Sequence, residues 1–200
     1  NVDAGPTRHS IFEPSEGFGQ HITNKSNISF KTSHLSAVGP LPKISMRTGL
    51  NGNQARLEIL WNGITKSSFI TPAKITVQWS KTLELAEINN SNTLIIQNTY
   101  STSDQHILAN ASLIYSRQFF FDNKADFSFA MTPQSSQRLL EINDFKSSGG
   151  SAFLYDFKNK TRYNTSIVGD KVRVIIDGSQ DTTSYKLVST VDGYLTVPVI

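Results

Sequence analysis

The sequence contains no cysteine, few charged residues and no long hydrophobic run. The absence of cysteine excludes thiol catalysis, thiolate metal sites and disulfide frameworks, although it leaves the compartment open. No stretch approaches the roughly 18 to 20 consecutive apolar residues that a membrane-spanning helix needs, so we expect no membrane span. The chain begins with Asn1, and no basic-then-apolar signal pattern follows. We therefore expect a mature or excised chain.

Charged residues make up 18% of the chain, against about 25% in an average soluble domain. The net charge is +3, and the 19 lysines and arginines are scattered without a run of three. Proteins that bind nucleic acid usually concentrate such residues on one face, so we expect no nucleic-acid partner. The isoelectric point near 9.1 still favours loose attachment to acidic glycans or membranes.

Hydroxyl and amide side chains supply the polarity instead. Serine, threonine and asparagine account for 25, 18 and 15 residues of the 200. Such residues solvate a surface without charge and suit turns and the outer faces of strands. This composition is more typical of extracellular β-proteins than of cytosolic enzymes, so we expect a secreted or cell-surface protein.

Hydrophobic residues recur with a period of two through most of the chain, which indicates strands with one buried and one solvated face. The repeated sets are Ile28 and Phe30; Ile44 and Met46; Leu57, Ile59 and Trp61; Ile75, Val77 and Trp79; Ile107 to Tyr115; Phe127 to Met131; Phe153, Tyr155 and Phe157; Val172 to Ile176; and Leu195 to Val199. Turn signals such as Asn62-Gly63 and Asp177-Gly178 separate them. The pattern predicts an all-β fold, an antiparallel β-sandwich of immunoglobulin-like or jelly-roll type with little or no helix.

The domain organisation expected from this pattern is simple. Residues 1–25 are irregular and rich in proline and glycine, so we expect an N-terminal arm there with at most one short strand. No composition shift or linker divides the remainder, which predicts a single β-sandwich domain over residues 26–200. The best short helical candidate, residues 135–143, could equally form a strand.

A search for catalytic and metal-binding patterns yields none with local support. The four histidines form no short metal-ligand spacing, and no Gly-x-Ser-x-Gly motif or phosphate-binding loop occurs. Asp122 and Asp126 could ligate calcium, but the dense Asp and Asn spacing of a calcium loop is missing. We therefore expect no enzymatic activity, no metal and no cofactor. A β-sandwich enzyme acting on polysaccharide stays open, because such enzymes build their sites from fold geometry.

Several aromatic and amide residues at strand ends are candidates for ligand binding. A rim indole or phenol beside an amide can stack on a sugar while the amide bonds its hydroxyls. Trp61 precedes the Asn62-Gly63 turn, although it could instead close the core as a buried residue. The set of candidate ligand-binding residues is Trp61, Asn62, Asn98, Tyr100, Tyr163 and Asn164. In addition, the run Phe119 to Phe121 must place at least one ring on the outer face of a strand, where it needs cover.

One local segment resembles a known family. Leu57-Glu-Ile-Leu-Trp-Asn-Gly63, followed by Lys66-Ser-Ser68, is similar to a strand-to-turn segment of cysteine-free subunits and adhesin domains of chaperone–usher fimbriae. The resemblance implies an immunoglobulin-like sandwich completed by a strand from a neighbouring subunit. Residues 1–20 lack the alternating apolar pattern of a donor arm, which favours a tip or adhesin domain over a shaft subunit.

These observations predict a non-catalytic surface domain, such as a fimbrial adhesin, that binds a cell-surface glycan or protein receptor. A structural assembly subunit, such as a pilus subunit or a viral capsid or spike domain, is the alternative. The polysaccharide-active enzyme is a second alternative.

Overall fold

The computed structural model describes residues 20–22, 25–51, 55–72, 76–99, 105–147 and 150–190. Over these residues the protein consists of β-strands, and its one helical segment is the single 3-10 turn η2 (Leu85–Glu87). The predicted all-β class is confirmed. No helix in the described part of the chain has the length and apolar character needed to cross a membrane.

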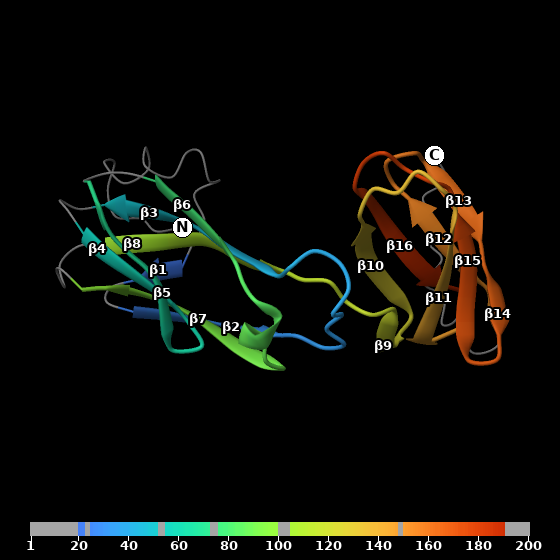
Figure 1. Cartoon of the computed structure of the whole chain (residues 1–200), viewed down its shortest axis with the longest axis horizontal. Helices are drawn as coiled ribbons and strands as arrows, with labels where there is room; N and C mark the ends of the chain where they lie inside the picture. Colours follow the sequence, from blue (N-terminus) through green and yellow to red (C-terminus); the bar gives the residue numbers. More distant parts are fainter. Residues whose placement is uncertain are drawn as a thin grey trace. The chain divides into compact units, whose positions relative to one another are not determined.

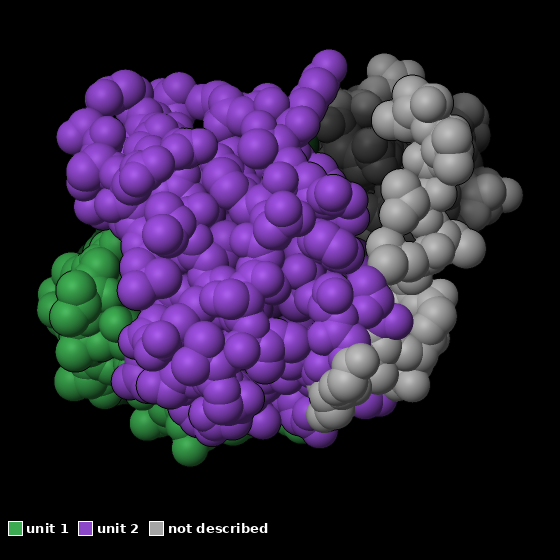
Figure 2. Space-filling model, turned by 90° about the vertical axis from the view of Figure 1, so that its right-hand side faces the viewer, with its two compact units in different colours: residues 1–117 green, residues 118–200 purple. Residues whose placement is uncertain are grey.

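The chain forms two compact units, residues 1–117 and residues 118–200, which Figure 2 shows in different colours. The single domain expected over residues 26–200 is therefore wrong, because each unit has its own hydrophobic core. No composition shift in the sequence marks this boundary, because only three residues separate Tyr115 from the run that begins at Phe119.

Unit 1 is a sandwich of two four-stranded antiparallel sheets with the strand orders β1-β8-β3-β6 and β2-β7-β4-β5 (Figure 1). The strands are β1 (Gln20–Ile22), β2 (Lys25–Lys31), β3 (Lys43–Asn51), β4 (Ala55–Trp61), β5 (Ile64–Thr71), β6 (Thr76–Thr82), β7 (Ser91–Asn98) and β8 (Gln105–Ile114). The first strand pairs with the eighth, the second with the seventh, the third with the sixth and the fourth with the fifth. The eight strands thus form one long two-stranded antiparallel ribbon, four strand pairs in length, that folds on itself as a jelly roll.

The core of unit 1 lies between these two sheets. Its buried residues come from β3, β4, β7 and β8 and from Leu83 after β6, and they include Ile44, Met46, Leu57 and Ile59. Because side chains on a strand alternate between its faces, the period-two pattern of the sequence places these residues inside. The core placement of the β3 and β4 repeats is therefore confirmed.

Unit 2 also contains two four-stranded sheets, with the orders β10-β16-β12-β13 and β14-β15-β11-β9 (Figure 1). The strands are β9 (Phe120–Lys124), β10 (Asp126–Met131), β11 (Arg138–Phe145), β12 (Ala152–Asp156), β13 (Thr161–Asn164), β14 (Ser166–Val168), β15 (Lys171–Ile176) and β16 (Thr183–Ser189). All pairings are antiparallel except that of β9 with β11, which is parallel. Residues 138–143 of the short helical candidate belong to strand β11.

An aromatic cluster fills one side of the core of unit 2. Phe121 is 1% exposed, and its ring stacks on Phe127 with centroids 4.1 Å apart. Phe129 packs against both Phe121 and Tyr185. Offset and edge contacts of this kind add about 0.5–1.5 kcal/mol beyond area burial.

The face assigned to β12 from the sequence is wrong. The pattern suggested that Phe153, Tyr155 and Phe157 face the core, but the buried residues of β12 are Ala152, Leu154 and Asp156. Both faces of this strand carry hydrophobic residues. A shift of one residue in the alternation therefore exchanges the predicted buried face with the predicted exposed face. Phe153 is covered by Arg162, whose guanidinium carbon lies 4.7 Å from the ring centroid.

Candidate ligand-binding site

Trp61 belongs to the core of unit 1 and is 1% exposed. Its ring lies 6.0 Å from that of Phe30, and its Nε1 donates a 2.8 Å hydrogen bond to the carbonyl of Glu87. A buried indole whose donor is already used cannot stack on a sugar in solvent. The binding role expected for Trp61 is wrong, and the structural alternative is confirmed.

Asn62 is also occupied by the fold. It takes a positive φ of 50° beside Gly63 at 82°, as the turn between β4 and β5 requires. Its amide nitrogen donates to the carbonyl of Glu87 at 3.1 Å and to Oδ1 of Asn92 at 3.0 Å, while its own Oδ1 accepts from the backbone N–H of Thr93. These bonds join the turn to η2 and to the first residues of β7, and they occupy both ends of the amide group.

The remaining candidates are divided between the two units. Asn98 lies half-buried at the end of β7, and Tyr100 lies outside the described residues. Tyr163 and Asn164 belong to β13 in unit 2. Of the described candidates, Asn98 thus belongs to unit 1, whereas Tyr163 and Asn164 belong to unit 2.

The Tyr163 hydroxyl lies at one end of unit 2 and donates a 3.3 Å hydrogen bond to Oδ2 of Asp177. Oδ1 of the same carboxylate accepts from Gln137 at 3.0 Å. Burial raises the pKa of Tyr163 above its usual value, and the backbone hydrogen bond with Asp177 partly offsets this. Asn164 stands exposed at the end of β13.

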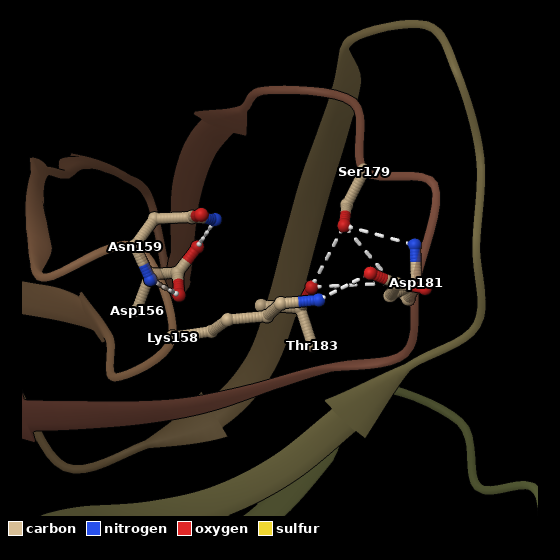
Figure 3. Close-up of polar contacts among 6 residues, drawn as sticks. All are labelled: Asp156, Lys158, Asn159, Ser179, Asp181 and Thr183. Carbon is tan, nitrogen blue, oxygen red and sulfur yellow. Dashed lines mark hydrogen bonds and ion pairs between the residues drawn. The ribbon is translucent and has the colours of Figure 1, made fainter.

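The turns at this end are joined by further polar contacts (Figure 3). Buried Asp156 accepts two hydrogen bonds from Asn159, one from the backbone and one from the amide. Lys158 contacts Asp181 at 2.5 Å, and this hydrogen bond lowers the pKa of the exposed Asp181 carboxyl.

The hydroxyls of Ser179 and Thr183 complete this set of contacts, 3.0 Å apart. The cavity beside them has a volume of about 10 Å³, roughly enough for one water molecule. We conclude that the polar side chains at this end hold the turns in place.

A larger hollow opens at the other end of β11. It has a volume of about 690 Å³ and belongs entirely to unit 2. It is lined by Phe120, Asn143, Asp144, Phe145, Ser147, Gly150, Ile167, Gly169 and Asp170. A hollow of this size falls within the range of small-molecule binding sites.

The strands explain why Phe120 reaches this hollow. Phe121 points into the core, so its neighbour Phe120 must point the opposite way. The parallel pairing of β9 with β11 then places Phe120 beside Asn143. Phe120 is 37% exposed. This confirms the expectation that one ring of the run would face outward.

The other groups of the hollow come from turns. Asp144 has a φ of 52° at the end of β11, and Gly169 has a φ of 64° between β14 and β15. Asp144 and Asp170 bring two carboxylates, Asn143 an amide and Ser147 a hydroxyl. The sequence did not predict these residues as a site, because a strand end and a turn more than 20 residues apart carry no common local signal.

The hollow combines one exposed aromatic ring with hydrogen-bonding groups, and none of its lining residues is a lysine, arginine or histidine. In the described residues, no group of three or more histidine, aspartate or glutamate side chains is placed to hold a metal ion. The arrangement suits a small, hydroxyl-rich ligand that presents an apolar face to the ring.

Comparison with known proteins supports the fold. No family model and no curated protein matches the chain. Dimeric latent PorU from Porphyromonas gingivalis is similar in structure, with a TM-score of 0.59 and 13% identity over 84% of this chain and 18% of PorU. The chain thus spans less than a fifth of the length of PorU.

A CBM36-1 domain of a multidomain xylanase from the hindgut metagenome of Trinervitermes trinervoides also matches. Its TM-score is 0.33 and its identity 15%, over 46% of this chain and 73% of that domain. A likeness of this extent carries no conclusion about this protein.

Proposed function

We propose that this β-sandwich protein is a non-catalytic binding protein of the secreted or cell-surface class, and that the hollow of unit 2 binds a carbohydrate. A cell-surface glycan is then the partner, and adhesion, as in a fimbrial adhesin, is the biological role. The proposal rests on one observation above all: Phe120 exposes its ring beside the amide of Asn143 in a hollow of about 690 Å³.

The chemistry of the hollow supports a sugar over other small ligands. A sugar ring has an apolar C–H face that packs on an aromatic ring, and its hydroxyls donate to carboxylates and amide oxygens. Asp144 and Asp170 can both accept such bonds. Their negative charges also disfavour acidic sugars at this position, because no basic side chain lines the hollow.

The test is a glycan array with the full chain, followed by titration calorimetry with the best neutral oligosaccharide. We expect Phe120→Ala to weaken binding about tenfold, because it removes a stacking contact worth about 1.4 kcal/mol. Phe157→Ala is the matched control, since Phe157 is 61% exposed and lies outside the hollow. Equal effects of both variants, or the absence of any glycan ligand, would contradict the proposal.

The two carboxylates of the hollow also favour a second candidate function. Asp144 and Asp170 line one hollow, and a glycosidase needs a pair of carboxyl groups. Release of reducing sugar ends from a polysaccharide, abolished by Asp144→Asn or Asp170→Asn, would establish an enzyme. We expect no turnover, and we expect both variants to weaken binding.

Assembly with neighbouring subunits by strand addition is supported by a different feature. β14 is an edge strand, all three of its residues are exposed, and they include Ile167 and Val168. Exposed strand edges pair readily with other chains. Light scattering across a concentration series tests this: self-association that Ile167→Lys reduces would support assembly, and a monomer at all concentrations would contradict it.

A further inference from the structure

We infer that one sheet face of unit 1 binds a polysaccharide carrying carboxylate or sulfate groups. The face is formed by the outward side chains of β6, β3 and β8, and we call it the β6–β3–β8 face. It is separate from the hollow of unit 2, and the inference does not depend on what that hollow binds.

Strand register places these side chains in three rows across the sheet. Arg47 of β3 lies between Gln78 of β6 and Asn110 of β8. In the next row, Ser45 lies between Ser80 and Ser112. Their neighbours on β3, Ile44 and Met46, are buried in the core. Because side chains alternate along a strand, the residues of the rows point away from the core.

The third row is formed by Thr82, Lys43 and Ile114. The nine positions therefore hold two cations and six neutral polar residues, and none is acidic. Lys43 and Arg47 stand on the same strand four residues apart, about 13 Å at the usual rise per residue. Two positive charges in line along a strand suit a polymer with repeated negative groups.

The guanidinium of Arg47 is partly buried on this face, and none of the described residues neutralises its charge. Within the described residues, no hydrogen bond or ion pair of its side chain is formed, and its Nε is buried without an acceptor. By contrast, Arg173 on the outer face of unit 2 contacts Glu141 at 2.6 Å. A guanidinium held on a flat sheet, without a carboxylate beside it, can form a two-pronged contact with a carboxylate or sulfate of a ligand.

The rest of the face supplies the groups that sugar hydroxyls need. The hydroxyls of Ser45 and Ser112 lie 2.8 Å apart and can each bond a further partner. Gln78 and Asn110 present amides on either side of Arg47. Hydroxyl and amide groups both donate and accept, so they suit a ligand covered with hydroxyls.

Other occupants fit this face less well. A protein interface needs an apolar centre, whereas the one apolar residue of the rows, Ile114, stands at an edge position of the array. Single-stranded nucleic acid is bound through aromatic stacking, and no aromatic residue belongs to the nine. The face is therefore complementary, in charge and in hydrogen-bonding groups, to an anionic polymer that is rich in hydroxyls.

The experiment measures binding of the full chain to three polymers by affinity gel electrophoresis. Alginate carries carboxylates, dextran sulfate carries sulfates, and dextran is neutral. We expect retardation by alginate or dextran sulfate, weaker at higher ionic strength, and none by dextran. The polymer that binds more tightly identifies the anionic group; equal retardation by dextran, or none by either charged polymer, would overturn the inference.

Variants then place the site on this face. Arg47→Gln should weaken binding about tenfold, as expected for loss of a charge-assisted contact, and Lys43→Gln should weaken it less. Arg47→Lys keeps the positive charge but lacks the planar guanidinium, so it should reduce the affinity for the charged polymer by an intermediate factor. It serves as the test if Arg47→Gln folds poorly. Arg56→Gln is the control, because Arg56 is exposed on β4 of the other sheet.

One result would contradict the placement, and another would contradict the choice of a polysaccharide as the ligand. An equal loss in Arg56→Gln would mean that overall charge, and not this face, holds the polymer. Competition by duplex DNA as strong as that by the polymers themselves would mean that the face binds any polyanion. Phe120→Ala should leave binding of the charged polymers unchanged, which separates this site from the hollow of unit 2.

Discussion

The indole of Trp61 and the backbone carbonyl of Glu87 are joined by a hydrogen bond of 2.8 Å, which ties the end of β4 to the 3-10 turn η2. Asn62 donates to the same carbonyl. The side chain of Glu87 in turn contacts Lys66 of β5. One residue of η2 thus links the β4–β5 hairpin to the segment that follows β6.

Replacement of Trp61 should destabilise unit 1. We expect Trp61→Ala to lower the free energy of unfolding by about 3–5 kcal/mol, because it leaves a large cavity in the core. Trp61→Phe should cost less, since it retains most of the ring packing with Phe30. Urea unfolding measured by circular dichroism checks this. Unchanged stability with a loss of glycan binding would instead return Trp61 to a ligand-binding role.

Glu87 should make unit 1 sensitive to acid. The hydrogen bond from Lys66 holds the pKa of the Glu87 carboxyl below its ordinary value of 4.5. A carboxyl with a lowered folded pKa stabilises the protein above the unfolded pKa, and this contribution is lost as the pH falls through the folded pKa. We therefore expect stability to decline from about pH 4.5 downward.

The variant Glu87→Gln isolates this contribution. It should be less stable than the parent at neutral pH and show a smaller decline in acid, because it has no carboxyl to protonate at this position. The hydrogen bonds to the Glu87 backbone should remain. Both tryptophans, Trp61 and Trp79, belong to unit 1, so tryptophan fluorescence can follow its unfolding. Parallel acid profiles of parent and variant would refute the assignment.

Unit 2 should lose stability in alkali. Burial raises the pKa of both Tyr163 and Tyr185. The folded state therefore favours the neutral phenols. Their contribution to the stability of unit 2 is complete below the unfolded pKa of about 10, and it is lost as the pH rises through the higher pKa values of the folded state. Ultraviolet titration should show two late-ionising tyrosines. Tyr163→Phe should remove one of them, and ordinary titration of all six tyrosines would contradict this prediction.

Gly178 should not tolerate a side chain. A Cβ at this position would lie 2.2 Å from the carbonyl oxygen of Ser135 and 2.4 Å from its carbon, and backbone atoms cannot move aside cheaply. We expect Gly178→Ala to destabilise unit 2 more than Gly63→Ala destabilises unit 1. Gly63 has a φ of 82° but open space around it. The cost of Gly63→Ala is therefore only the backbone strain of a positive φ, about 1–2 kcal/mol. Thermal unfolding of the two variants gives the comparison, and equal losses would show that Ser135 shifts.

The sequence alone determined the alternation of buried and exposed positions in most strands. Ile44 and Met46 of β3, and Val172 and Val174 of β15, lie on the faces that the period of two assigned. This succeeds because one face of each of these strands is hydrophobic, while the other carries charged or polar residues, with Ile175 of β15 as an exception. In β12 both faces are hydrophobic, so the pattern could not decide between Phe153 and Leu154 as the inward residue.

The tertiary structure decided the division into two units and the position of every candidate site. Whether Trp61 lines a rim or closes a core depends on η2, which lies more than 20 residues further along the chain. Phe120, Asp144 and Asp170 meet at one hollow, and Arg47 lies between Gln78 and Asn110, because strand pairing brings distant segments side by side. Alternation along a strand is a local property of the backbone, whereas the neighbours of a strand are chosen by the packing of the whole sheet.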